Sequence, residues 1–390
     1  MDMAGQDSAV STLRAAAAAA GQIVNGVDVP HGVMTHAWLF TGPPGSGRST
    51  AARAFAAALQ CAEGGCGRCH ACHTASTGTH ADVRFVVSEG LSISVDEIRT
   101  LILQASGSPT QGRWQVLLIA DADRLTEAAG NALLKAIEEP PPRTVFLLCA
   151  PSTHPEDVSV TIRSRCRVLT LGTPSAETVA AVLTERDGIA AADALWAAAA
   201  AQGHIEHARR LATDDAARQR RAAVLGIPRS LTGVSAAFDA AATLIAATEE
   251  EAAAAVVDVS AREKSEMETA LGAGGTGKGA AAAARGTAGI LKDLERRQKS
   301  RATRAKRDAL DRALVDLAGL YRDILVWTVG ATVSPIHADV VEMTRAAGEK
   351  WTPESTLRRL EAVLACREAI DANVKPRIAV ESMMLRLWRG

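Results

Sequence analysis

The first 172 residues alternate between short apolar runs and amphipathic or alanine-rich segments. The apolar runs have the length of buried strands, and they cover residues 36–41, 83–87, 114–120, 145–150 and 168–171. The segments before and between them predict helices at residues 8–24, 49–60, 94–105 and 125–139. Ser94, with Glu97 three residues later, predicts a capped helix start. Strands that alternate with helices predict a parallel sheet covered by helices on both faces.

Strand patterns nearly disappear after Pro174. Residues 175–212 predict several short helices. Helical patterns then dominate from about residue 222 to the end, with breaks near residues 226–234, 270–289 and 330–336. We therefore expect three domains: an α/β domain at residues 1–172, a small helical domain at residues 173–222, and a larger all-α domain at residues 223–390.

The composition limits the classes of function. The 390 residues carry a net charge of −1, so bulk charge gives no strong affinity for nucleic acid or membranes, and any DNA contact must come from local patches. No secretion signal is evident, because Asp2 and Asp7 precede the alanine run at residues 15–20. No apolar stretch reaches the roughly 20 residues of a membrane-spanning helix. These features predict a cytoplasmic protein, in which clustered cysteines more often bind metal than form disulfides.

A glycine-rich loop follows the first predicted strand and opens the next helix, which is the setting that a phosphate loop requires. In such a loop, backbone N–H groups wrap the phosphates, a lysine reaches them, and a hydroxyl binds Mg²⁺. The candidate binding residues are Gly42, Gly45, Gly47, Arg48, Ser49 and Thr50. Arg48 stands at the lysine position, and this exchange is not conservative because a guanidinium is bulkier and planar. Two interpretations stay open: a loop that still binds nucleotide, and a turn kept only for structure.

A second glycine-lysine string at residues 272–278 has no preceding strand and no hydroxyl residue after its lysine. We expect it to be a loop between helices.

Four cysteines lie within twelve residues of one another, directly after the phosphate-loop helix. They are Cys61, Cys66, Cys69 and Cys72. Four thiolates suit tetrahedral Zn²⁺, and a closed shell of four cysteines is structural rather than catalytic. The alternative is four free cysteines in a loop, which a reducing compartment permits but which rarely cluster so tightly. The spacing therefore predicts a structural zinc site.

The apolar run at residues 114–120 stands where an ATPase carries its second acidic motif. In an active enzyme this strand ends in an Asp that holds Mg²⁺, followed by a Glu that polarises the attacking water. Ala120 and Asp121 occupy these two positions. Together with Arg48, they indicate that any ATP–Mg²⁺ bound at the loop is not hydrolysed.

Two strings are the most specific in the chain: Asn-Ala-Leu-Leu-Lys-Ala-Ile-Glu-Glu-Pro-Pro at residues 131–141 and Ser-Arg-Cys at residues 164–166. With the strand at residues 36–41, the cysteine module and the segment 373–381, they resemble the bacterial clamp-loader subunits of the AAA+ class. This machinery opens the ring-shaped sliding clamp and sets it on primed DNA. The resemblance implies an AAA+ phosphate-loop domain with an inserted zinc module at residues 61–72, then a helical lid and an all-α collar that oligomerises.

The family contains active motor subunits and a related subunit with degraded ATPase motifs, and the departures here resemble the latter. Glu206 stands where the motors carry a sensor arginine, and Arg209 is a candidate substitute one turn on. The resemblance implies a component of DNA polymerase III that is not an ATPase by itself. Arg165, from the Ser-Arg-Cys string, is then the expected catalytic residue, an arginine finger donated in trans to a neighbouring subunit.

The partners implied by the resemblance are the gamma/tau motor subunits, the delta subunit, the sliding clamp through the assembly, and primer–template DNA, within a cytoplasmic hetero-oligomer at the replisome. Two rival functions stay open. A motor paralogue of the gamma/tau type would hydrolyse ATP alone. A zinc-containing DNA-binding adaptor would bind DNA alone, with strong salt dependence.

A basic run at residues 292–307 leaves two interpretations, a nucleic-acid or partner face and a solvated helix face. The scarcity of interleaved aromatic residues for base stacking favours the solvated face.

Overall fold

The computed structural model describes residues 3–88, 90–105, 107–270 and 280–390. The chain divides into two compact units, Met1–Arg209 and Arg210–Gly390. The glycine-lysine string at residues 272–278 lies outside the described residues.

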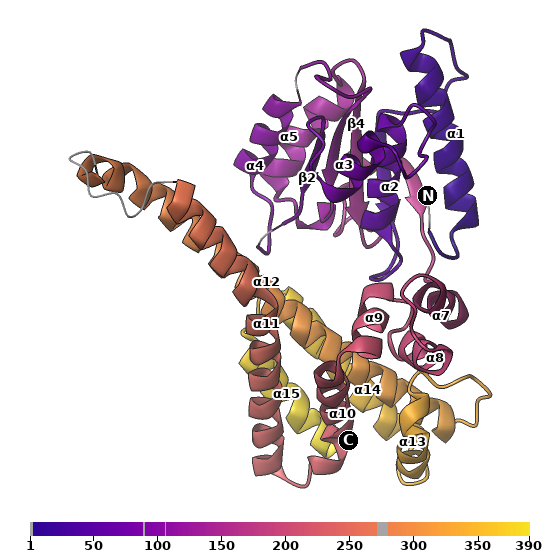
Figure 1. The fold of residues 1–390 in the computed structure, drawn as a ribbon. Coiled ribbons are helices and arrows are strands. Elements are labelled where there is room, and N and C mark those ends of the chain that lie inside the picture. The colour runs from indigo at the N-terminus through magenta and orange to yellow at the C-terminus, as the bar shows by residue number, and fades with distance from the viewer. Residues whose placement is uncertain (1–2, 89, 106, 271–279) are drawn as a thin grey trace. The chain divides into compact units, whose positions relative to one another are not determined.

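A five-stranded parallel sheet forms the centre of the first unit (Figure 1). Its strands are β1 (Ala37–Thr41), β2 (Val83–Val86), β3 (Gln115–Ile119), β4 (Thr144–Ala150) and β5 (Arg167–Thr170). They lie in the order β2-β3-β4-β1-β5. All five predicted strands are present, and the expected parallel sheet is confirmed.

Helices cover both faces of this sheet. The first unit contains α1 (Asp7–Val24), α2 (Arg48–Gln60), α3 (His70–Thr77), α4 (Val95–Gln104), α5 (Glu127–Glu138), α6 (Val160–Arg163), α7 (Ala176–Glu185), α8 (Ala191–Ala200) and the start of α9 (Ile205–Thr213), with a 3₁₀ turn at Ala122–Arg124. Helices α7, α8 and α9 follow the last strand and contribute to neither of the cores that lie against the sheet. Successive residues of a strand point to opposite faces. Trp38 therefore packs with α1 and α2 in one core, while Leu39 packs with α4 and α5 in the other. The capping box predicted at Ser94 is present.

The second unit is helical throughout its described residues. Its helices are α10 (Asp215–Ser230), α11 (Val234–Ala270), α12 (Ala280–Thr328), α13 (Val341–Gly348), α14 (Pro353–Asp371) and α15 (Pro376–Arg389), with a 3₁₀ turn at Ala338–Val340. One core joins them through buried side chains such as Leu317, Tyr321, Val363 and Met384. The helical character predicted for this half of the chain is confirmed.

One predicted break starts later than the sequence indicates. Helix α10 continues through Pro228 to Ser230, although proline removes one helical hydrogen bond. Val224, Leu225 and Ile227 are buried in the core of the second unit, and this packing offsets the local penalty. Along the chain, the boundary between the two compact units falls between Arg209 and Arg210. This boundary lies inside the segment that is expected to form the lid, and the division into three domains stays a prediction.

Among the helices of the described residues, none combines the length and the apolar character needed to cross a membrane.

Candidate functional site

The glycine-rich loop joins β1 to α2 at the carboxyl edge of the sheet. Gly45 and Gly47 have φ angles of 86° and 85°, a left-handed conformation that glycine adopts at little cost. Gly47 directly precedes the first turn of α2. A glycine turn that opens onto a helix N-terminus is the architecture of phosphate-binding loops. The structure therefore brings the predicted loop residues together in the expected setting.

Two buried polar atoms of this loop have no hydrogen-bond partner: the hydroxyl of Ser46 and Nη1 of Arg48. Buried polar atoms are normally paired, because an unpaired one costs the desolvation of its group. A bound anion would supply acceptors for both atoms. The loop therefore fits a phosphate group, although its lysine is replaced.

The end of β3 offers few side-chain ligands for the Mg²⁺ ion that accompanies ATP. Ala120, at the end of β3, offers no side-chain oxygen. Asp121 accepts a hydrogen bond from the backbone N–H of Ser88 at 3.2 Å. Ser49 lies beside the thiol of Cys149, whose pKa burial raises to about 12, so this thiol stays neutral. Ala120 thus removes one of the two carboxylates that an ATPase carries at these motif positions, while Asp123 lies near Asp121 and Arg48.

A turn distant in sequence lies against the phosphate loop. A Cβ atom at Gly45 would stand 2.8 Å from both Cα and Cβ of His204. Gly203, just before it, has a φ of 87°, and a Cβ there would collide with Thr173 and Pro174. The sequence pattern does not identify His204 as a neighbour of the loop, and its only signal is that His204 lies two residues before Glu206, which stands at the sensor position.

Arg209, the candidate substitute for the sensor arginine, is engaged by two carboxylates of its own unit. Its Nε donates to Asp187 at 2.8 Å and its Nη1 to Glu206 at 2.5 Å. These contacts hold the pKa of Arg209 above its usual value. The arginine is therefore committed to ion pairs with Asp187 and Glu206.

Arg165 lies in the turn between α6 and β5, with about a third of its side chain exposed. Its Nη2 lies 2.5 Å from Oε1 of Glu138, the last residue of α5. Its Nη1 donates to the carbonyl of Thr161 at 3.0 Å and to the hydroxyl of Ser164 at 3.3 Å. Glu138 was not identified as a partner from the sequence, although it belongs to the Glu-Glu-Pro-Pro string.

The four cysteine sulfurs all lie within 4.8 Å of one another. Sγ of Cys61 is 3.6 Å from that of Cys66 and 3.8 Å from that of Cys69. A tetrahedral ion with metal–sulfur bonds of about 2.3 Å would separate its sulfurs by about 3.8 Å. The measured separations therefore fit a four-thiolate metal site.

Backbone geometry prepares these sulfurs as ligands. The N–H of Cys66 points to Sγ of Cys61, and the N–H of Cys72 points to Sγ of Cys69, both at 3.4 Å. Burial opposes ionisation of Cys61, but the N–H groups of Cys66, Gly65 and Glu63 lower its pKa to about 6. Burial raises the pKa of Cys72 to about 12. Backbone N–H groups also lower the pKa of Cys66, so two thiols of the cluster ionise more easily than usual, whereas a cation would have to deprotonate Cys72.

Side chains outside the cluster tie it to the sheet. Arg113 donates from Nη1 to the carbonyl of Cys61 at 2.9 Å. Gln60 accepts from the backbone N–H of Arg113 at 2.9 Å. Asp82 is buried and accepts from the backbone N–H groups of Thr110 and Gln111, each at 2.8 Å. These contacts fix the loop before β3 against the end of α2, and sequence analysis did not find them.

The region that contains the sheet, the phosphate loop and the cysteine cluster is similar to known proteins. Residues 27–175 match the family model described as DNA polymerase III, delta subunit. DNA polymerase III subunit gamma/tau of Mycobacterium tuberculosis is 35% identical over 173 residues, which cover 42% of this chain and 30% of that protein. Subunit delta' of Haemophilus influenzae is 37% identical over 150 residues, which cover 37% of this chain and 45% of that protein. Subunit delta' of Bacillus subtilis is 35% identical over 139 residues, which cover 35% of this chain and 42% of that protein.

Each match thus spans less than half the length of the relative concerned. The family model covers the sheet, the phosphate loop, the cysteine cluster and Arg165. The resemblance inferred from the motifs is thereby confirmed over residues 27–175, which are similar to DNA polymerase III clamp-loader subunits of the gamma/tau and delta' types.

Proposed function

We propose that this chain is a non-motor subunit of the replicative clamp loader, equivalent to delta prime. It helps to assemble the loader that opens the sliding clamp and places it on primed DNA. The observation that carries the proposal is the contrast between the two halves of the ATPase apparatus. The residues for its own hydrolysis are replaced at Arg48, Ala120 and Asp121, whereas Arg165 is present and partly exposed.

The role of the phosphate loop in this proposal is structural. Arg48 and the glycine turn provide an anion site, and ATP binds there weakly if at all. Close contact between Gly45 and His204 ties the loop to the lid turn. Without a lysine and an Asp-Glu pair, bound nucleotide is not hydrolysed.

Arg165 acts on a neighbouring subunit. ATP held by a gamma/tau motor supplies the phosphoryl group, and the guanidinium of Arg165 stabilises the charge that develops on it during transfer. The ion pair with Glu138 keeps the guanidinium at the surface in one orientation. A planar fork with several donors suits this task better than a point charge.

The cysteine cluster holds a structural Zn²⁺. Cys61, Cys66, Cys69 and Cys72 supply all four ligands, so no position remains for a substrate or water. The ion would stabilise the segment between α2 and α3, which contains few buried apolar side chains.

The assembly is a cytoplasmic hetero-oligomer in which this chain contacts gamma/tau and delta and reaches the clamp and primer–template DNA through the complex. A second candidate, a motor of the gamma/tau type, is kept because gamma/tau relatives match at nearly the same identity as delta' relatives.

ATP turnover distinguishes the two candidates. The purified chain alone should not hydrolyse ATP above background, and its addition to gamma/tau and delta should raise clamp-dependent ATP hydrolysis by the mixture. Turnover by the lone chain at the rate of a motor subunit would favour the second candidate. Failure to enter a complex with gamma/tau and delta would contradict both.

A further inference from the structure

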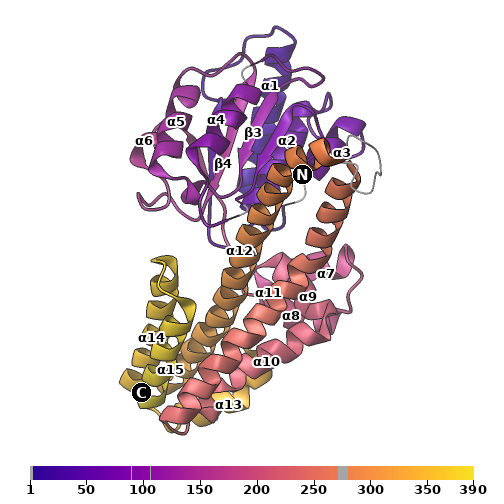
Figure 2. The same cartoon turned by 90° about the vertical axis from the view of Figure 1, so that its left-hand side faces the viewer.

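Helices α11 and α12 continue beyond the core of the second unit as a hairpin arm, formed by residues 253–270 and 280–308. The two helices run side by side (Figure 2). Ala252 and Ala309 are the last buried residues at its base, and none of the side chains described between them is buried. Because burial drives packing, the described side chains of the arm contribute little to the core. Its length calls for another explanation.

Polar contacts join the two helices of the arm. Arg301 pairs with Glu263 at 2.9 Å, and Lys306 pairs with Glu249 at 2.9 Å near the base. Gln298 donates to the carbonyl of Ser260 at 2.9 Å. Two acids of α11, Glu263 and Glu249, thus pair with bases of α12.

The segment of α12 at residues 292–307 is rich in bases. Residues 292–307 hold eight Lys or Arg and two acids, whereas the whole chain has a net charge of −1. The rest of the chain is therefore acidic. Lys292, Arg296 and Lys299 follow one another at the spacing of one helix face, which lies away from Arg301 and also carries Glu295. All three are exposed, as is Arg297. The arm thus presents a positive stripe on an otherwise acidic protein.

We propose that this stripe binds the phosphate backbone of nucleic acid. From Lys292 to Lys299 the stripe covers about 10 Å of helix at 1.5 Å per residue, which suits successive phosphates of one strand. The absence of aromatic residues from 292–307 excludes base stacking as a source of affinity. Binding is therefore sequence-independent and driven by release of counterions. The inference concerns the arm alone and does not depend on the clamp-loader role.

The test uses the full chain and a fluorescent DNA duplex. Fluorescence anisotropy would be measured at several salt concentrations from about 50 to 200 mM. The variant carries Lys292→Gln, Arg296→Gln and Lys299→Gln. The logarithm of its affinity should depend less steeply on the logarithm of salt concentration, with a slope lower by about 0.9 for each lost phosphate contact, and its affinity should fall by about tenfold or more at the lowest salt. Circular dichroism would verify that the variant keeps its helix content.

A matched control removes the same charge elsewhere. Arg14→Gln, Arg84→Gln and Lys350→Gln replace three exposed bases outside the arm, and this variant should bind duplex like the parent chain. If both variants lost the same amount of affinity for the duplex, the effect would be due to bulk charge and the proposal would be overturned. Absence of duplex binding by the parent chain would also overturn it. Equal competition by phosphatidylserine vesicles would overturn the nucleic-acid assignment in favour of a membrane surface. The anisotropy measurement does not involve ATP. A negative result would therefore contradict DNA binding by the arm without contradicting the proposed function.

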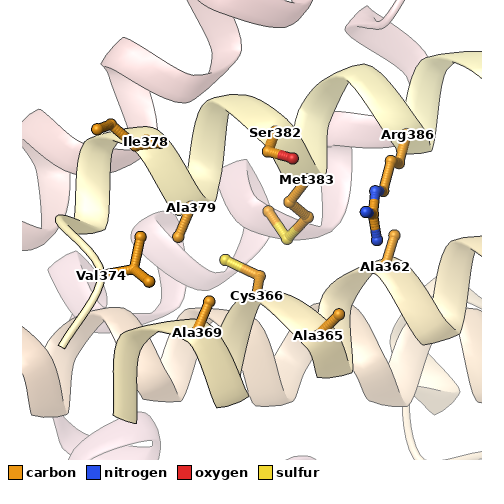
Figure 3. Close-up of a pocket in the computed structure, with 10 residues that line it drawn as sticks. All are labelled: Ala362, Ala365, Cys366, Ala369, Val374, Ile378, Ala379, Ser382, Met383 and Arg386. Carbon is orange, nitrogen blue, oxygen red and sulfur yellow. The ribbon is translucent and has the colours of Figure 1, made fainter. Parts of the chain in front are cut away.

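No second inference is added: the groove of about 220 Å³ between α14 and α15, lined by Ala365, Cys366 and Ile378 (Figure 3), has nothing in the structure to indicate what covers it.

Discussion

Glu138 and Arg165 join the two most specific strings of this sequence in one ion pair, with 2.5 Å between Oε1 and Nη2. The carboxylate belongs to the Glu-Glu-Pro-Pro string at the end of α5, and the guanidinium to the Ser-Arg-Cys string before β5. Both side chains are more than a third exposed, so the pair contributes little to folding. Its consequence is orientation of the guanidinium at the surface.

Removal of this arginine should affect a partner rather than this chain. In a reconstituted loader, Arg165→Ala should slow ATP hydrolysis, because one neighbouring site loses its guanidinium, an effect of about 10³–10⁵ at that site in related enzymes. The loss for the whole assembly is partial, since other subunits supply their own arginines. Arg165→Lys should restore little. An unchanged rate of hydrolysis and clamp loading in the Arg165→Ala loader would contradict the arginine-finger role.

The stability of the isolated chain provides the control for that experiment. Glu138→Gln and Arg165→Ala should each change the free energy of unfolding by less than about 1 kcal/mol, because a half-exposed ion pair is worth no more. Urea denaturation followed by circular dichroism measures this. A loss of several kcal/mol would mean that the pair is structural, and slower loader turnover could then result from misfolding.

Metal analysis tests the cysteine cluster. The purified chain should contain about one Zn²⁺, because the sulfurs lie at tetrahedral spacing. A chelator should release the ion and make four additional thiols reactive. Cys66→Ser should lower zinc content and increase proteolysis between α2 and α3, while the sheet stays folded on its own core. Cys366→Ser, a buried cysteine in the second unit, is the matched control and should keep its zinc. A protein without zinc whose four cysteines titrate freely would exclude the site.

Alanine substitutions at two glycines of the phosphate loop distinguish the cost of backbone strain from the cost of a steric clash. Gly45 and Gly47 have nearly the same positive φ, so alanine at either position costs about 1–2 kcal/mol of conformational strain. A Cβ at Gly47 meets open space, whereas one at Gly45 meets His204 at 2.8 Å. Gly45→Ala should therefore lower the thermal stability of the chain more than Gly47→Ala. Equal effects would show that the turn of His204 does not rest on the loop in solution.

Asp316 should make the stability of the chain depend on pH. Burial raises its pKa to about 7, and the nearby charges of Asp339 and Glu251 also raise it, whereas Arg221 and Arg312 lower it. Between about pH 4 and pH 7 the folded chain then holds a proton that the unfolded chain has lost. The contribution of this group is thus present at low pH and is lost as the pH rises through 7.

The variant Asp316→Asn isolates this contribution. In this variant, the free energy of unfolding should no longer decrease as the pH rises through 7. At pH 8 the variant should be more stable than the parent, by about 1.4 kcal/mol for each unit of pKa difference between the folded and unfolded chain. Buried His337 has a lowered pKa and contributes with the opposite sign, so the difference between parent and variant is the quantity to measure. Identical pH profiles from urea denaturation would contradict the raised pKa.

The sequence by itself determined the elements whose formation depends on neighbouring residues. The strand of Trp38 and Leu39 is predicted because an apolar run of that length must be buried on both faces. The cysteine cluster is predicted because its four ligands lie within one short segment. The altered ATPase motifs are likewise evident from residues adjacent in sequence.

Only the tertiary structure decided the contacts between residues far apart in the chain. His204 against Gly45, Glu138 beside Arg165 and Arg113 on the carbonyl of Cys61 each join segments separated by tens of residues or more. Periodicity and spacing report local geometry, and they do not specify which surfaces meet when a sheet and its helices pack. Helix α10 shows the same limit, because burial of Val224 and Ile227 carries it through a proline that local propensity would treat as its end.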